Sequence, residues 1–333
     1  MGDSVATGRP SVLAVSEEAL ERAARVLRGG GLVAFPTETV YGLGADAANP
    51  SAVARIFAAK GRPADHPLIV HVASAATARD WAASFPESAR ALADAFWPGP
   101  LTMVLPRSER VPDAVTGGRP TVGLRVPDQP VARALLERFG GGVAAPSANR
   151  FGRVSPTTAA HVAADLGERV DLVVDGGPCA VGVESTIVEI DGDRLAVLRT
   201  GAVTADDIAA VTGLPVAATP TGPARAPGML AAHYAPRARV VLAEAPEAAE
   251  TVARWVEKGH QVAVLAEVLP ADLPGEALPL AAVGSARDYA RVLYQRLRDV
   301  DAAGADVVVA VPPAPVGIGL AVRDRLLRAS RSH

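Results

Sequence analysis

Short apolar runs alternate with longer amphipathic segments over the first two thirds of the chain. The short runs have the length of buried strands, whereas apolar residues recur every three or four positions in the longer segments, as they do in helices. Strands are expected at residues 32–35, 68–72, 101–105, 122–126, 143–145, 172–174, 186–190 and 195–198. Helices are expected at residues 16–29, 50–59, 86–96, 130–138, 157–165 and 204–211. This alternation predicts an α/β domain over residues 12–212.

Capping residues support several of the expected helix ends. Ser16 can cap the first helix, whose first turn carries two glutamates where negative charge is favoured. The helix expected at 157–165 follows Pro156, so Ser155 or Thr157 can cap it. Each of these hydroxyls would accept from backbone N–H groups that have no partner within the helix.

The pattern changes at residue 213, where prolines recur among Ala, Thr and Gly without helix or strand periodicity. We expect residues 213–238 to form a linker. After the linker, strands are expected at 239–243, 261–266 and 306–310, and helices at 246–257, 286–299 and 318–328. This order predicts a second, Rossmann-like α/β domain over residues 239–330, with a small parallel sheet and no phosphate-binding loop.

Composition indicates a globular protein, because 49% of the 333 residues are hydrophobic and 21% are charged. No apolar run approaches the roughly 20 residues of a membrane span, and the first ten residues lack the apolar core of an export signal. We therefore expect a soluble, cytoplasmic protein without a membrane partner. The single cysteine, Cys179, excludes an internal disulfide framework and a cysteine-rich metal site.

The net charge of −3, from 33 basic and 36 acidic residues, disfavours a protein that neutralises duplex phosphates over a broad surface. Local basic clefts are compatible with that balance. Candidate chemistry is therefore sought in short polar segments at strand ends, where α/β sheets usually place their ligands.

Residues 36–44, Pro-Thr-Glu-Thr-Val-Tyr-Gly-Leu-Gly, follow a predicted buried strand with three hydroxyls and a carboxylate in five positions. Each buried hydroxyl needs a hydrogen-bond partner, so the segment is either an ordinary polar turn or part of a site. The spacing of Gly42 and Gly44 resembles a dinucleotide-binding fingerprint, but the polar run before them is incompatible with its tight strand-to-helix turn.

Two cations, Lys60 and Arg62, lie in a proline-flanked turn at the end of a predicted helix. They suit a polyphosphate, although cations at a helix C-terminus also favour the macrodipole. His71 lies in an apolar strand, where a histidine is more often a satisfied core residue than a binding group.

The strand expected at 122–126 places Arg125 on the same face as Thr121 and Gly123. An arginine on a strand face needs an anion or water. Either a ligand or an acidic side chain from elsewhere in the fold can supply that anion.

Two further segments bring polar side chains to strand ends. Ser147 and Asn149 lie just beyond the carboxyl end of a short predicted strand. An Asp-Gly turn at 191–192 predicts a hairpin that brings Ser185 beside Arg199.

Together these segments supply cations and neutral donors. The cations are Lys60, Arg62, Arg125 and Arg199, and the neutral donors are Thr39, Ser147, Asn149, Ser155 and Ser185. This set fits a triphosphate plus a small polar substrate better than a nucleophilic enzyme. The sequence contains no nucleophile elbow, Walker lysine loop or His-Glu-x-x-His motif. Cys179 is interpreted as a turn residue.

Six segments occur in the order seen in the YrdC-type threonylcarbamoyl-AMP synthases: PTETVYGLG, KGRPADHPLIVH, WPGPLTMVL, TVGLRVP, APSANRFGRVSPT and GVESTIVEI. Two later segments, APGMLAAHYAP and GLAVRDRLLRAS, resemble the long, two-domain branch of that family. The resemblance covers residues 12–329. It implies a YrdC-like twisted mixed sheet with helices and a large concave cleft, followed by the small C-terminal domain.

The resemblance also implies an activity, that of a nucleotidyltransferase. L-Threonine, bicarbonate or CO2 and ATP would give threonylcarbamoyl-AMP and pyrophosphate, and separate transfer proteins would use the product to modify the adenosine beside the anticodon of tRNA. Mg²⁺ would arrive with ATP, because the sequence shows no clustered carboxylates that would form a private metal cage. A weak contact of the synthase itself with tRNA is left open.

Carried over residue by residue, the resemblance assigns the site residues. Threonine would be bound by Thr39, His71, Arg125, Ala145 and Ser185. ATP would be bound by Lys60, Arg62, His66, Thr121, Ser147, Asn149, Ser155, Arg199 and Tyr234, with Lys60 and Arg62 also stabilising charge in catalysis. Tyr234 would close over the site, which makes the linker at 213–238 a candidate lid.

Two other interpretations are kept. A related carbamoyl-adenylating enzyme starts from carbamoyl phosphate, but such proteins carry additional domains for which this chain has no room. A non-catalytic RNA-binding module is a candidate of a different class, which the acidic balance and an aromatic content of 4% disfavour.

Overall fold

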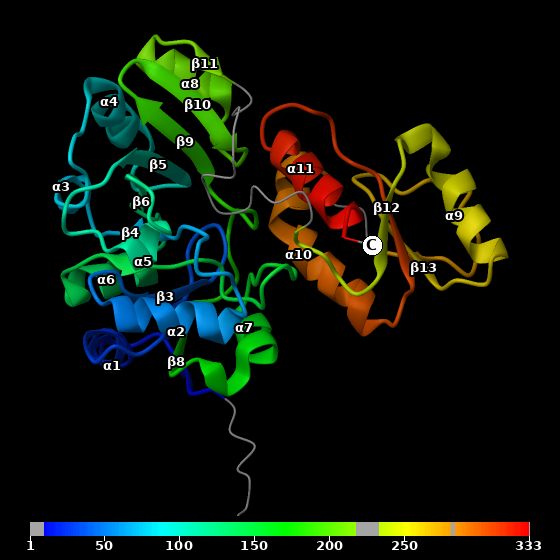
Figure 1. Cartoon of the computed structure of the whole chain (residues 1–333). Helices are drawn as coiled ribbons and strands as arrows, with labels where there is room; N and C mark the ends of the chain where they lie inside the picture. Colours follow the sequence, from blue (N-terminus) through cyan, green and yellow to red (C-terminus); the bar gives the residue numbers. More distant parts are fainter. Residues whose placement is uncertain (1–9, 218–232, 281–283, 333) are drawn as a thin grey trace, which may run out of the picture.

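Eleven strands form one large mixed sheet in the first part of the computed structural model, which describes residues 10–217, 233–280 and 284–332 (Figure 1). In spatial order these described strands are β1 (Val12–Ala14), β8 (Leu172–Asp175), β2 (Val33–Phe35), β3 (Gly42–Asp46), β7 (Val143–Ala144), β4 (Ile69–His71), β6 (Thr121–Arg125), β5 (Leu101–Pro106), β9 (Thr186–Asp191), β10 (Arg194–Arg199) and β11 (Val216–Ala217). Strand β6 runs parallel to β4 and antiparallel to β5. The expected mixed α/β sheet is thereby confirmed.

Helical layers cover both faces of this sheet. The helices are α1 (Glu17–Arg28), α2 (Pro50–Lys60), α3 (Ala75–Arg79), α4 (Glu87–Phe96), α5 (Asp113–Thr116), α6 (Pro130–Phe139), α7 (Ala159–Leu166) and α8 (Ala205–Thr212), with a 3-10 turn at Gly167–Arg169. Alternate residues of β2 face opposite layers. Val33 and Phe35 pack with α1 and α6, whereas Ala34 packs with α2 and α7. Strand β2 is therefore apolar on both sides.

One expected cap is confirmed and another is wrong. The Ser16 side chain accepts from the Ala19 N–H, as predicted. The later helix, α7, is capped by Thr158 rather than by Ser155 or Thr157. The Pro156 and Thr157 carbonyls accept from the N–H groups of other segments, so the chain is still extended there and the helix begins later.

The polar segment at 36–44 ends in strand β3, which the sequence did not predict as a strand. It pairs antiparallel with β2. A Cβ on Gly44 would lie 2.7 Å from Val143 Cγ1 and 2.8 Å from Phe35 Cε1, so glycine allows the close packing of β2, β3 and β7. Strand β11, which pairs with β10, lies within the stretch 213–238 where only a linker was expected.

The second part of the chain has a small parallel sheet of β12 (Arg239–Leu242), β15 (Val307–Ala310), β13 (Val262–Leu265) and β14 (Leu278–Pro279), in that order. Its helices are the 3-10 turn Ala245–Glu247, α9 (Ala248–Glu257), α10 (Ala286–Ala302) and α11 (Gly319–Ser330). Helix α9 packs on one face, and α10 and α11 pack on the other. In the described ranges, no helix is both long and apolar enough to span a membrane.

Helices α10 and α11 lie on the side of the C-terminal part that faces the first domain (Figure 1). Gly182 lies against α10, because a Cβ there would come within 2.4 Å of the Ala290 carbonyl oxygen. Its φ of +84° also favours glycine. Val40, Val154 and Val183 of the first domain join the hydrophobic core of the C-terminal part, so the two parts share a packed interface.

Candidate functional site

A pocket lies beside β4, β6 and β7. His71 of β4 lies opposite Arg125 of β6 in the parallel register, and opposite Val143 of β7 on its other side. This register brings two predicted site residues together where both parallel strands end. The pocket is lined by Thr37, Thr39, Val40, Gly42, Arg62, Ile69, His71, Arg125, Ala145, Pro146, Ser147, Glu184, Ser185, Arg199, His233 and Tyr234.

The predicted site residues fall into two groups. The pocket wall includes Thr39, His71, Arg125, Ala145, Ser185, Arg62, Ser147, Arg199 and Tyr234. Outside the wall lie Lys60, His66, Thr121, Asn149 and Ser155. The wall therefore contains every residue expected to bind threonine and part of the set expected to bind ATP.

Arg125 is buried and has an acidic partner in the protein. Its Nη2 donates to Glu38 Oε1 at 2.6 Å, Nη1 donates to Thr39 Oγ1 at 3.0 Å, and Nε donates to the Gly99 carbonyl at 3.2 Å. A guanidinium has five N–H groups, so two remain for a ligand. The sequence left open whether a ligand or an acidic side chain meets Arg125, and Glu38 is that acidic side chain.

His71 is buried in the pocket wall. Its ring and the Phe35 ring meet edge to face, with 6.3 Å between their centroids. Burial and the charge of Arg125 lower the pKa of His71 to about 3. Its Nδ1 has no hydrogen-bond partner among the described residues. A neutral imidazole with an unused nitrogen can donate to or accept from a small polar ligand.

The predicted hairpin does bring Ser185 beside Arg199. Arg199 donates from Nε to the Ser185 carbonyl and from Nη2 to Ser185 Oγ, each at 3.0 Å. Thr102 Oγ1 lies 2.8 Å from the same hydroxyl. These contacts fix the orientation of Ser185 at the pocket wall.

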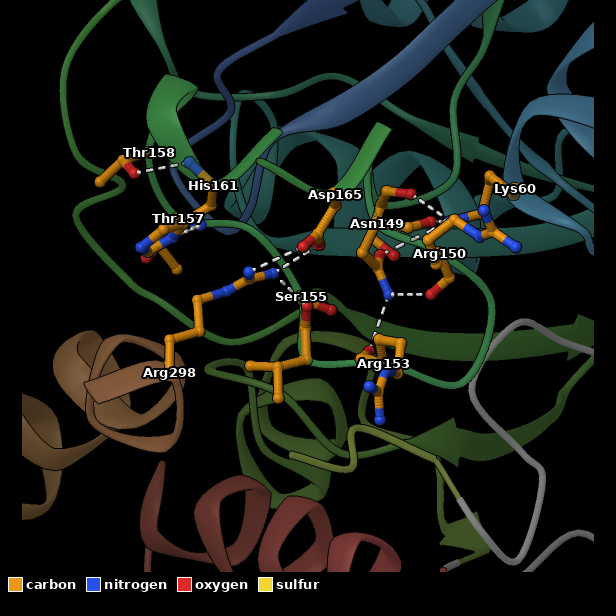
Figure 2. Close-up of polar contacts among 12 residues, drawn as sticks. Lys60, Asn149, Arg150, Arg153, Ser155, Thr157, Thr158, His161, Asp165 and Arg298 are labelled. Carbon is orange, nitrogen blue, oxygen red and sulfur yellow. Dashed lines mark hydrogen bonds and ion pairs between the residues drawn. The ribbon is translucent and has the colours of Figure 1, made fainter. Parts of the chain in front are cut away.

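Lys60 is not one of the residues that line the pocket. Figure 2 shows it beside Asn149 and the loop that follows. Its Nζ donates to the carbonyls of Ser147 and Asn149, each at 2.5 Å. The Asn149 amide in turn donates to the carbonyls of Arg150 at 2.9 Å and Arg153 at 2.7 Å. Burial, followed by the charge of Arg62, lowers the pKa of Lys60. Lys60 and Asn149 thus shape the loop that presents Ser147.

Arg62 and His66 lie near the Phe151 ring. The Arg62 Cζ is 5.9 Å from the ring centroid, and the His66 ring is 5.5 Å from it. Burial lowers the pKa of Arg62 to about 10, so it is still a cation at neutral pH. Thr121 lies at the opposite end of β6 from Arg125, paired with Pro106.

Tyr234 and His233 form the part of the pocket wall that we call its cover. Tyr234 is fully buried at φ 65°, an uncommon conformation for a residue with a side chain. His233 lies 6.0 Å from the Phe151 ring, and burial lowers its pKa to about 3. With both rings in place the cavity measures about 50 Å³, enough for a few water molecules. Of the predicted lid at 213–238, residues 218–232 lie outside the described residues.

Glu184 is the acidic member of the pocket wall, and the sequence gave it no role. Ser155 donates to it at 2.6 Å, Tyr294 at 2.8 Å and Arg325 at 2.7 Å. Burial raises its pKa, but the charges of Arg325 and Arg199 and the Ser155 hydrogen bond outweigh burial and lower the pKa to about 2. Glu184 is therefore a carboxylate at physiological pH.

Glu38 and Glu184 were missed for the same reason. Both stand in quoted polar segments, and an acidic residue among hydroxyls before a buried strand was the available signal. Their partners come from distant parts of the chain, which no local pattern reveals. In the described ranges, no group of three or more His, Cys, Asp or Glu side chains could hold a metal ion.

Comparison with known proteins identifies the family. A family model described as telomere recombination matches residues 25–201, and one described as the C-terminal domain of threonylcarbamoyl-AMP synthase matches residues 203–331. A threonylcarbamoyl-AMP synthase from Pyrococcus abyssi is 43% identical over 328 residues, which cover 95% of each chain. The chain belongs to the threonylcarbamoyl-AMP synthase family.

Two further comparisons agree with this membership. A threonylcarbamoyl-AMP synthase from Bacillus subtilis is 40% identical over 334 residues, 96% of this chain and 94% of that protein. A crystal structure of Pyrococcus abyssi Sua5 complexed with L-threonine has a TM-score of 0.88 and 41% identity, with 97% of each chain covered. The family resemblance and the two-domain α/β fold inferred from the sequence are thus confirmed.

Proposed function

We propose that this member of the threonylcarbamoyl-AMP synthase family condenses L-threonine, bicarbonate or CO2 and ATP, and releases threonylcarbamoyl-AMP and pyrophosphate. The observation that carries the proposal is one pocket that combines Arg125, His71 and Ser185 with the cations Arg62 and Arg199. An amino acid and the phosphates of a nucleotide need such groups side by side. The names of full-length relatives support the same activity.

For threonine, the two remaining N–H groups of Arg125 would bind the carboxylate, with Thr39 and Ser185 as hydroxyl partners. The Ala145 N–H already donates to the Ile69 carbonyl at 2.9 Å, so the Ala145 carbonyl would accept from the substrate amine. Neutral His71 would complete this side of the pocket. A neutral imidazole is suitable there because an imidazolium would repel both the ammonium form of the substrate and Arg125.

For ATP, Arg62 and Arg199 would contact the phosphates, with Ser147, Asn149, Ser155, Thr121, His66 and Tyr234 as the other proposed contacts. Lys60 donates two of its three N–H groups to loop carbonyls. Its Nζ also lies 3.5 Å from Asn149 Oδ1. We propose that the N–H of this long contact turns to a phosphate while the other two hold the loop. Cations in these places would stabilise the charge that grows on the departing pyrophosphate.

The reaction needs the reactants to be held in position and water to be excluded from the site. It needs no protein nucleophile. The threonine amine and bicarbonate give a carbamate and water, and the carbamate oxygen then attacks the α-phosphorus as pyrophosphate leaves. Because the carbamate loses CO2 readily in water, the site must exclude solvent. Holding the reactants together supplies on the order of 7–11 kcal/mol of the barrier. Cys179 is buried, and burial raises its pKa, which keeps its thiol unreactive.

Magnesium is proposed to enter with ATP and to neutralise part of the phosphate charge. In the described pocket wall Glu184 is the acidic residue, and its oxygens are bound by Ser155, Tyr294 and Arg325. The donor set of the chain therefore suits a metal held mainly by the nucleotide.

Closure of the site is proposed to involve the linker. Tyr234 and His233, which line the pocket, would move to admit the nucleotide and return before the carbamate forms. The product would pass to separate proteins that modify the adenosine beside the tRNA anticodon. Because ATP and threonine are cytoplasmic metabolites, we propose the cytoplasm as the site of the reaction.

The proposal is tested by pyrophosphate release from ATP with L-threonine and bicarbonate. Release is expected to require both, and to fall when L-serine replaces L-threonine, because a missing methyl group loses contacts in a closed pocket. Release that is indifferent to the amino acid would contradict the proposal.

Two additional assays, one with carbamoyl phosphate and one of RNA binding, distinguish the two other interpretations. Adenylation that depends on carbamoyl phosphate and not on threonine would favour the carbamoyl-phosphate enzyme. Tight RNA binding with steep salt dependence, together with no threonine-dependent release, would favour the RNA-binding module.

A further inference from the structure

Glu184 connects the pocket to the C-terminal domain. It lines the pocket beside Ser185, and its Oε1 accepts from Ser155 of the first domain at 2.6 Å. Its Oε2 accepts from Tyr294 of α10 at 2.8 Å and from Arg325 of α11 at 2.7 Å. A carboxylate of the pocket wall is thus held by two side chains of the other domain.

This connection is buried. The side chains of Arg325 and Glu184 are 0% and 7% exposed. Arg325 also donates to the Thr200 carbonyl at 3.0 Å and pairs with Asp324 at 2.6 Å. Burying an ion pair costs desolvation that apolar packing would avoid, so such a pair is weak evidence for stability alone. Its position beside the pocket points to a role in geometry.

The same two side chains also support the cover of the pocket. The Tyr234 ring stacks on Tyr294 with centroids 5.8 Å apart and an interplanar angle of 28°. The Arg325 Cζ lies 5.2 Å from the centroid of the Tyr234 ring. Arg325 and Tyr294 therefore contact both Glu184 in the wall and Tyr234 in the cover.

We propose that Arg325 and Tyr294 are positioning residues for the synthase site, and that the C-terminal domain acts in the reaction by holding Glu184 and Tyr234 through them. This inference rests on the proposed function. Arg325 balances the negative charge of Glu184. Without Arg325, Glu184 would attract Arg199, whose positive charge also acts on this carboxylate. Arg199 then keeps its bonds to Ser185, and the wall keeps its shape.

Tyr294→Phe is the first test, because it removes the hydroxyl and keeps the ring on Tyr234. We expect kcat/KM for L-threonine to fall about tenfold, mainly through KM, since a small displacement in a closed site is costly. Calorimetric binding of L-threonine should weaken by a similar factor. A role limited to stability would lower the unfolding temperature and leave both values of the folded enzyme unchanged.

Arg325→Met is the second test, paired with Arg325→Met/Glu184→Gln. The single variant leaves a buried carboxylate without its cation, so it should lose more threonine affinity than Tyr294→Phe and can lose stability as well. The double variant removes the unbalanced charge. It should recover folding and part of the threonine affinity of the single variant.

Asp165→Asn is the matched control. Asp165 of α7 pairs with Arg298 of α10 at 2.6 Å, and both side chains are 17% exposed (Figure 2). Neither residue of this second ion pair between the domains is among the described residues that line the pocket, and Arg298 also donates to the Val154 carbonyl at 2.6 Å. The variant should lower the unfolding temperature and keep the KM for L-threonine within about twofold of the wild type.

The outcomes separate this inference from the proposed function. If the wild-type chain makes no threonylcarbamoyl-AMP, the proposed function fails. If the wild type is active and Tyr294→Phe and Arg325→Met keep the wild-type KM and threonine affinity, the positioning role is overturned. It is also overturned if Asp165→Asn raises KM as much as Tyr294→Phe does.

Discussion

The charged residues of the pocket differ in how the protein balances them. Arg125 has a buried carboxylate at 2.6 Å, so its charge is largely compensated before a ligand arrives. Arg62 instead donates to the Pro67 carbonyl at 3.0 Å, and its buried Nε has no hydrogen-bond partner within the described residues. Arg125 is therefore suited to orienting a carboxylate, and Arg62 to stabilising new negative charge.

Replacing Arg62 tests this difference. In Arg62→Ala we expect kcat/KM to fall on the order of a hundredfold or more, because charge on the leaving pyrophosphate loses a partner. The unfolding temperature should stay close to that of the wild type. The measurement is pyrophosphate release at saturating threonine, and wild-type-like activity would remove Arg62 from the phosphate site.

Buried histidines predict how stability depends on pH. Burial lowers the pKa of both His71 and His233 to about 3, whereas each titrates near 6.5 in the unfolded chain. Below pH 6.5 the unfolded chain binds protons that the folded chain does not, so stability is full above that pH and is lost as pH falls. Each histidine should cost about 2 kcal/mol between pH 6.5 and 5. Urea midpoints across this range measure the loss, and a constant midpoint would contradict it.

At the level of elements, short stretches of sequence predicted most of the helices, strands and turns that depend on neighbouring residues alone. The Asp-Gly turn at 191–192 predicted both the hairpin and the approach of Ser185 to Arg199, because a turn type fixes the register of its strands. Strand β3 was missed because its glycines, together with the hydroxyl residues that precede it, resemble a turn. Gly44 is explained by its close approach to Phe35 and to Val143, and Val143 is about a hundred residues away in the sequence.

Gly44→Ala tests that explanation. The added Cβ would lie 2.7 Å from Val143 Cγ1 and 2.8 Å from Phe35 Cε1, closer than packing allows. We expect a loss of about 1–3 kcal/mol in the free energy of unfolding. Gly275→Ala is the control, because no atom lies within 4 Å of its Cβ position. Equal unfolding midpoints for the two variants would show that β3 tolerates the side chain.

At the level of the whole molecule, the site depends on contacts that no short pattern contains. Glu38 and Arg125 are 87 residues apart in the sequence, and Glu184 and Arg325 are 141 apart. The sequence predicted many of the side chains that line the pocket, because family motifs carry that information, but it missed Glu184 and also included residues that lie outside the wall. It left the role of the C-terminal domain open, because that role lies in pairs between the domains.

Cutting the chain near residue 222, outside the described residues, tests whether the linker closes the site. If Tyr234 is held down by an intact linker, the cut should either abolish synthesis or raise ATP turnover without product. The measurement compares pyrophosphate release with product formation in the cut and intact proteins. Unchanged kinetics in both assays would remove the linker from the mechanism.

The central claim is that one pocket joins threonine, bicarbonate and the adenylate of ATP. The most direct measurement incubates the full chain with ATP, L-threonine and ¹³C-bicarbonate and determines the product by mass spectrometry. We expect a threonine–AMP adduct that is one mass unit heavier with the labelled bicarbonate than with the unlabelled salt. Absence of the adduct, or an adduct that carries no label, would contradict the account.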